Sequence, residues 1–158
     1  MNPRPILRLP GEGRSGELPG EKFVGKLGAN DTQGHIALAQ YELAPGHGTT
    51  EHRHMRSGEL FYVLSGEALF EIERMEYPAP QGSTLWVPPG ASHRISNIAT
   101  RPVTMLGAFA PAGPEALFPA MMELHQRSNG APSPEELAVV RKEHDIIHVG
   151  PSRFGRQD

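Results

Sequence analysis

Residues 46–66 read GHGTTEHRHMRSGELFYVLSG and place three potential metal ligands, His52, His54 and Glu59, in one short segment. Alternate residues of a β-strand point to the same face, so His52 and His54 are expected to face inward together. Leu60–Leu64 is rich in β-branched and aromatic residues, which places Glu59 at the start of a strand, facing back toward the histidines.

A second stretch, residues 82–97, reads GSTLWVPPGASHRISN and adds His93 after a Pro-Pro-Gly turn. Imidazole and carboxylate groups suit a divalent first-row metal, and a chain without cysteine has no thiolate site. The donor set is compatible with iron, manganese, nickel, zinc or copper and does not choose between them. The two stretches together therefore predict a site of three histidines and one carboxylate for one divalent transition metal ion per chain.

These residues carry a resemblance to the cupin family. Residues 46–66 match the family pattern G-x5-H-x-H-x3–4-E-x6-G at every fixed position, and residues 82–97 match its second pattern, G-x5-P-x-G-x2-H-x3-N. The resemblance implies an all-β fold, the antiparallel jelly-roll β-barrel. It also implies that the metal ligands are His52, His54, Glu59 and His93.

The composition fits one domain built mainly from strands. Among 158 residues there are 18 glycines and 16 prolines, as expected where short strands are joined by turns. The net charge is -3 and both signs are mixed along the chain, which argues against a nucleic-acid partner. No long apolar run or apolar signal core is found, so we expect no membrane partner and a cytoplasmic location.

The chain is expected to have three parts. Residues 1–21 form an irregular arm crowded with proline, glycine and charge. Residues 22–110 alternate strand patterns with turns and form the barrel, with the proline-containing residues 77–82 as a loop. Residues 111–158 form a short C-terminal helical extension packed on the barrel, because residues 114–128 and 134–144 show helical spacing.

The N-terminal arm suggests how the chain associates. A barrel of this kind leaves sheet edges exposed, and an apolar patch in the arm can cover one edge of a neighbouring chain. We therefore expect a homodimer, with the patch formed by Ile6, Leu7 and Leu9.

The helical tail and its closing IIHVG segment loosely resemble bacterial monocupins described as quercetin-dioxygenase-like. That resemblance implies a metal-dependent dioxygenase with a small-molecule substrate that is aromatic or enolisable. Glu59 would then be a catalytic residue as well as a ligand, taking a proton from a substrate hydroxyl. Phe61, Val63 and Ile95 share strand parity with Glu59 and His93, so they are expected to line an apolar substrate pocket.

Two other functions stay open at this point, and the sequence does not decide whether the chain is an enzyme. The same cavity could bind a metal or a small molecule without turnover, or it could serve a sugar isomerase or epimerase. A phosphosugar enzyme needs a cation aimed into the cavity. Arg94 should face outward by parity, so the predicted strands offer no inward lysine or arginine.

Overall fold

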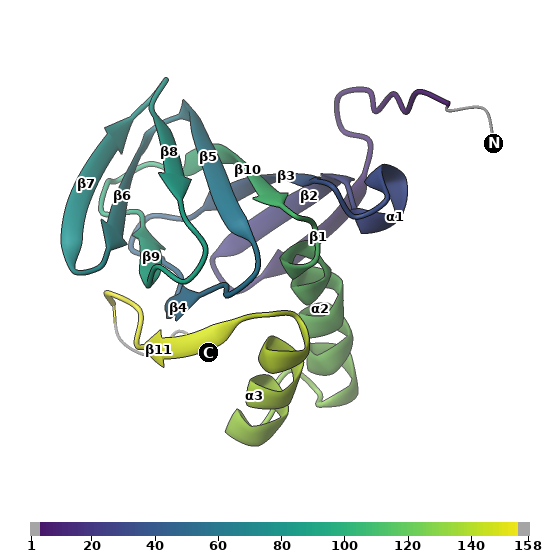
Figure 1. Cartoon of the computed structure of the whole chain (residues 1–158). Helices are drawn as coiled ribbons and strands as arrows, with labels where there is room; N and C mark the ends of the chain where they lie inside the picture. Colours follow the sequence, from purple (N-terminus) through teal and green to yellow (C-terminus); the bar gives the residue numbers. More distant parts are fainter. Residues whose placement is uncertain (1–3, 155–158) are drawn as a thin grey trace.

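The fold is taken from a computed structural model, which describes residues 4–154 (Figure 1). Its strands form two antiparallel sheets. The six-stranded sheet has the order β1 (Arg14–Leu18), β2 (Glu21–Leu27), β3 (Ala37–Leu43), β10 (Val103–Ala110), β5 (Gly58–Ser65) and β8 (Thr84–Val87). The five-stranded sheet has the order β11 (Ile147–Gly150), β4 (Glu51–Arg53), β9 (His93–Ser96), β6 (Glu67–Ile72) and β7 (Met75–Pro80). The predicted all-β barrel with a C-terminal helical extension is confirmed.

The core lies between the two sheets, and its alternating pattern is clearest along β3. In β3, every second residue from Ala37 to Leu43 is buried, which is the period expected of a strand with one face on the core. The main core cluster draws on both sheets and comprises Leu43, Phe61, Val63, Ala68, Phe70, Ala79, Val87, Ile95, Val103 and Met105.

The helices are α1 (Ala29–Thr32), the 3-10 turn η1 (Pro114–Ala116), α2 (Leu117–Arg127) and α3 (Pro134–Glu143). A capping box begins α3: Ser133 Oγ accepts from Glu136 N at 3.2 Å, and Ser133 N donates to Glu136 Oε2 at 2.9 Å. In Figure 1, α2 and α3 lie together at one end of the six-stranded sheet, and the chain then returns as β11 to pair with β4. The extension therefore brings β11 beside a strand that carries a predicted site residue, His52.

Two predicted irregular segments are strands in the structure. Residues 14–18, inside the predicted N-terminal arm, pair with β2 as β1. The predicted loop at residues 77–82 is wrong, because most of it belongs to β7, which pairs with β6. β7 is the edge strand of its sheet, and an edge strand tolerates Pro78 and Pro80 because its outer side needs no hydrogen-bond donors.

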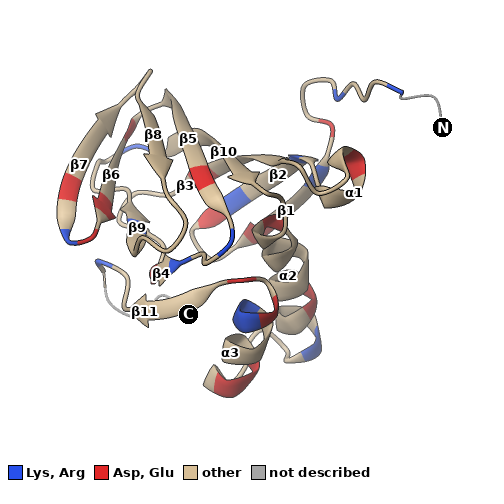
Figure 2. Cartoon of the chain, viewed as in Figure 1, with Lys and Arg blue, Asp and Glu red and all other residues tan. Residues whose placement is uncertain are grey.

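Surface charge of both signs is spread over the molecule. Figure 2 shows lysine and arginine segments interspersed with aspartate and glutamate segments on the sheets and the helices. Ile6, Leu7 and Leu9 are exposed, and the homodimer expected from them stays a prediction. No helix within residues 4–154 combines the length and apolar character needed to cross a membrane.

Candidate metal centre

The four predicted ligands come from both sheets. His52 lies in β4 and His54 directly follows that strand, while His93 begins β9 and pairs with His52 across the two strands. Glu59 lies in β5 of the opposite sheet. One ligand atom from each of the four residues lies within 4.8 Å of all the others. We call His52, His54, Glu59 and His93 the His-Glu cluster.

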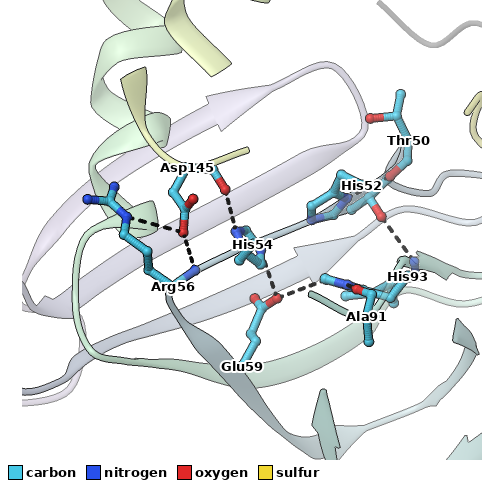
Figure 3. A network of polar contacts seen from close by, with 10 residues as sticks. Thr50, His52, His54, Arg56, Glu59, Ala91, His93 and Asp145 are labelled. Atoms are coloured by element: carbon cyan, nitrogen blue, oxygen red, sulfur yellow. Dashed lines mark hydrogen bonds and ion pairs between the residues drawn. The ribbon is translucent and has the colours of Figure 1, made fainter. Parts of the chain in front are cut away.

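The side chains of the His-Glu cluster touch one another in the interior (Figure 3). Glu59 Oε2 lies 3.2 Å from His93 Nε2 and 3.4 Å from His54 Nε2. The ring centroids of His52 and His93 are 4.4 Å apart. His54, Glu59 and His93 are buried and His52 is partly buried, so three groups with lone pairs or charge have been removed from water at one point.

Each imidazole of the cluster is oriented by a backbone carbonyl. For His52, His54 and His93 the acceptors of the Nδ1–H group are the carbonyl oxygens of Thr50 (2.7 Å), Asp145 (3.3 Å) and Ala91 (3.1 Å), respectively. A carbonyl can only accept, so Nδ1 carries a proton in all three rings and Nε2 is the ring atom left to face a metal ion. The Nε2 atom of His93 is also hydrogen-bonded to Glu59 Oε2, at 3.2 Å. This is the support that metal-binding histidines usually receive from their neighbours.

The electrostatics of the cluster favour a neutral His52 and an ionised Glu59, while the contact with Glu59 outweighs burial and raises the pKa of His93. Burial, together with the nearby His93 and His54 rings, holds the pKa of His52 well below its usual value, so this ring is neutral at pH 7. Burial works against a charged Glu59, but the contacts with His54 and His93 outweigh it and lower the pKa of Glu59 to about 2. Metal ions bind neutral imidazole and ionised carboxylate.

A divalent metal ion fits this donor set. The buried Nε2 of His54 lies 3.4 Å from Glu59 Oε2 but makes no hydrogen bond within residues 4–154, and a buried polar atom without a hydrogen bond normally costs free energy. Three imidazole Nε2 atoms and one carboxylate oxygen around one point match the ligand preferences of first-row transition metals. The arrangement can therefore bind such an ion with its own residues.

A cavity of about 170 Å³ lies beside the His-Glu cluster, and its wall is mainly apolar. Of the predicted pocket residues, Phe61 and Ile95 line this cavity, whereas Val63 packs within the core cluster and is not part of the wall. Part of the wall comes from the C-terminal extension, which contributes Leu117, Phe118, Met121, His125, Leu137, Arg141 and Ile146.

Several polar residues near the cavity escaped the sequence analysis. Tyr41 and Glu21 line the cavity from β3 and β2, and strand parity in those segments was the signal that could have found them. His47 also lines the cavity and lies against Gly20, where an added Cβ would come within 2.1 Å of its ring. Asp145, whose carbonyl orients His54, carries no sequence signal for that role.

Comparison with known proteins gives the family. Residues 39–109 match the family described as "Cupin domain". An uncharacterized protein of Methanocaldococcus jannaschii is 31% identical over 70 residues, covering 44% of this chain and 56% of that protein. The tetracenomycin polyketide synthase protein TcmJ of Streptomyces glaucescens is 31% identical over 77 residues, covering 49% and 52%. An oxalate-binding protein of Thermotoga maritima is 32% identical over 60 residues, covering 38% and 50%. The chain thus spans about half the length of the curated relatives it matches.

Solved structures share the fold. KdgF from Halomonas sp. has a TM-score of 0.61 at 16% identity, covering 68% of this chain and 94% of that chain. A putative sugar phosphate isomerase from Acidithiobacillus ferrooxidans has a TM-score of 0.51 at 28% identity, covering 65% and 69%. The likeness to KdgF, at this identity, is evidence for the fold alone.

Proposed function

This chain belongs to the cupin family, with its cupin domain at residues 39–109, and we propose that it is a metal-dependent dioxygenase acting on a small aromatic or enolisable substrate. The observation that carries the proposal is the position of the His-Glu cluster beside a mainly apolar cavity. An oxygen-bearing substrate in that cavity would have its polar end at the cluster and its apolar body against the walls.

The residues of the cluster would hold one divalent ion, His52, His54 and His93 through Nε2 and Glu59 through a carboxylate oxygen. A redox-active ion bound there would supply the one-electron chemistry that dioxygen requires. Phe61, Ile95 and the extension would exclude water and hold a flat substrate in place.

Glu59 has two proposed roles, metal ligand and proton acceptor, and its pKa favours the first. A pKa of about 2 keeps the carboxylate ionised at neutral pH, as both ligation and proton acceptance require. The same low pKa makes it a weak base, since general bases work best with a pKa near the operating pH. We therefore propose ligation as its main role and proton transfer from a substrate hydroxyl to a Glu59 oxygen as its second.

The Glu59→Gln variant separates these roles. If Glu59 only ligates, the variant has lower metal affinity and regains turnover when excess metal is supplied. If Glu59 also accepts the proton, the reloaded variant stays slower by ~10²- to 10⁴-fold, because an amide cannot take the proton. Full turnover of the metal-saturated variant would rule out the base role.

The proposed activity is tested by oxygen uptake after anaerobic loading with Fe(II), Mn(II), Ni(II), Cu(II) or Zn(II). Flavonols, single-ring phenols and small enols serve as substrates, and the zinc form is the control without redox chemistry. We expect oxygen consumption matched to substrate loss with at least one redox-active metal. Metal binding without any oxygen uptake would instead favour a binding protein, as the name of the oxalate-binding relative from T. maritima also suggests.

A sugar-phosphate isomerase is the second candidate, favoured by one observation. Arg141 of α3 lines the cavity and supplies a cation from outside the barrel strands. The likeness to the putative sugar phosphate isomerase of A. ferrooxidans supports the same candidate. Aldose–ketose interconversion of phosphosugars by the metal-loaded protein, lost in Arg141→Ala, would favour it over the dioxygenase.

A further inference from the structure

We propose that Tyr41 and Glu21 form a second polar subsite in the cavity, which binds a hydroxyl group of a ligand about the size of one aromatic ring. The inference rests on the proposed function, because the other end of the same ligand is taken to face the His-Glu cluster. It adds the size and the second functional group of the ligand, which the cluster alone does not specify.

The Tyr41 hydroxyl is the first observation. Tyr41 is 5% exposed and lines the cavity, yet its hydroxyl has no hydrogen-bond partner in the described part of the chain. A buried hydroxyl without a partner costs free energy, and phenylalanine would fill the same space without that cost. A ligand hydroxyl or carbonyl in the cavity would satisfy the group.

The ring of Tyr41 is held firmly in place. It crosses Gly107 of β10, where an added Cβ would lie 2.4 Å from its Cε2 atom. From the extension, the Phe118 ring packs against it, with the centroids 5.2 Å apart. A hydroxyl on a ring fixed in this way loses little freedom on binding, which favours recognition of a partner in one position.

Glu21 lies next to Tyr41 on the same face of the sheet. In the pairing of β2 with β3, Phe23 is opposite Tyr41 and Glu21 is opposite Leu43, so Glu21 and Tyr41 are diagonal neighbours. The Glu21 carboxylate also lines the cavity, and it makes no ion pair or hydrogen bond within residues 4–154. Burial, reinforced by the charge of Glu59, raises the pKa of Glu21 to about 7, so this group can accept or donate a hydrogen bond near neutral pH.

The cavity volume sets the ligand size. Tyr41 is on β3 and Glu59 is on β5, and the Tyr41 ring crosses the strand between them, β10, at Gly107. A cavity of about 170 Å³ compares with the roughly 150 Å³ cavity that holds benzene in an engineered protein. The ligand class is therefore a single ring, or an enol of similar size, with a metal-binding oxygen group at one end and a hydroxyl at the other.

Calorimetric titration of the Zn(II)-loaded protein with three probes tests this subsite without turnover. Benzohydroxamate is the parent chelator, and its 3-hydroxy and 4-hydroxy derivatives add one hydroxyl on the far side of the ring. We expect wild type to bind one derivative more tightly than the parent by roughly 3- to 10-fold, the usual effect of one hydrogen bond.

Matched variants assign the preference to its residues. Tyr41→Phe is expected to abolish the preference by weakening the binding of the hydroxy derivative, and Glu21→Gln is expected to reduce the preference. Tyr62→Phe removes the same atom from an exposed side chain of β5, and Glu17→Gln makes the same change in an exposed carboxylate of β1. Both controls should keep the full preference.

The outcomes separate the two proposals. If wild type binds the parent but prefers neither derivative, or if Tyr41→Phe keeps the preference, the subsite is overturned and the proposed function stands. If the parent fails to bind the fully zinc-loaded protein, the cluster is not a substrate site, and the subsite falls together with the proposed function.

Discussion

The His-Glu cluster and the proposed subsite of Tyr41 and Glu21 share one cavity but depend on different features of the sequence. At the His-Glu cluster, all four side chains come from residues 52–93, within the cupin domain, and two of the three orienting carbonyls lie two residues before the histidine they serve. In the proposed subsite, Tyr41 and Glu21 come from β3 and β2, and the covering side chains come from α2 and α3. The cluster thus depends on the spacing of residues within short motifs, whereas the subsite depends on packing between segments far apart in the chain.

This difference suggests that the two groups of residues have different roles. The cluster supplies donor groups that many chemistries can use, while contacts between distant segments shape the rest of the cavity. The C-terminal extension contacts the cluster at Asp145, which follows α3 and whose backbone carbonyl accepts a hydrogen bond from His54. Variants in the cluster, in the subsite and at Asp145 should therefore have separable effects on metal binding, ligand binding and stability.

The largest expected effect is at the cluster itself. His52→Ala and His93→Ala each remove one of four ligands, and we expect a metal content near zero where wild type holds about one divalent ion per chain. Elemental analysis after dialysis measures this. His35→Ala, which changes an exposed histidine, is the control and should keep its metal. Full occupancy in both ligand variants would refute the assignment of the cluster.

Asp145→Ala should have the next largest effect. The Asp145 carboxylate accepts from Arg56 N at 2.9 Å and holds the segment whose carbonyl orients His54. Its backbone has a φ of 60°, which aspartate tolerates better than alanine. Because the support of a ligand is weakened but no ligand is lost, we expect about a 10-fold lower metal affinity in chelator competition. Glu143→Ala, on the exposed side of α3, should leave the affinity unchanged, and an Asp145→Ala variant as tight as wild type would contradict the role of the extension.

Gly107→Ala tests whether the Tyr41 ring packs against Gly107. The added methyl would meet the Tyr41 ring at 2.4 Å, so the core is overpacked and we expect a loss of about 1–3 kcal/mol in unfolding free energy, measured by urea denaturation. Gly25→Ala is the matched control in β2, where the nearest atom to an added Cβ is Arg14 O at 3.6 Å. Equal stability of Gly107→Ala and wild type would mean that Tyr41 does not occupy this position.

The smallest expected effect is the pH dependence contributed by Glu21. Its pKa is about 7 in the folded protein against a usual 4.5, so its contribution to stability is fully present below pH 4.5 and is lost as the pH rises through 7. Glutamine does not titrate, so Glu21→Gln should gain melting temperature relative to wild type at pH 8 compared with pH 5. Melting curves of the metal-free protein measure this, with Glu17→Gln as the control. A difference of the opposite sign would show that Glu21 is not enclosed.

Much of the structure could be predicted because its signals are local. The cluster follows from fixed spacings in two short motifs, and α3 follows from a serine, a proline and a glutamate at its start. β7 was missed because proline was taken to indicate a loop, and only the order of strands in the sheet shows that Pro78 lies on an edge.

The subsite depends on contacts between distant residues, which no local sequence pattern contains. Tyr41 is buried by Gly107 and Phe118, which lie more than sixty residues away in the chain. Strand parity predicts that Tyr41 points inward, but it does not show that the hydroxyl lacks a partner. Arg141 reaches the cavity from a helix outside the barrel, so an analysis limited to strands could not find it.

The central claim is that His52, His54, Glu59 and His93 hold one metal ion. Anomalous diffraction from crystals of protein loaded with one equivalent of Zn(II), recorded on both sides of the zinc edge, tests it most directly. We predict one peak per chain between the four residues, at about 2.0–2.2 Å from each ligand atom. A zinc peak elsewhere on the chain, with none between these residues, would contradict the account.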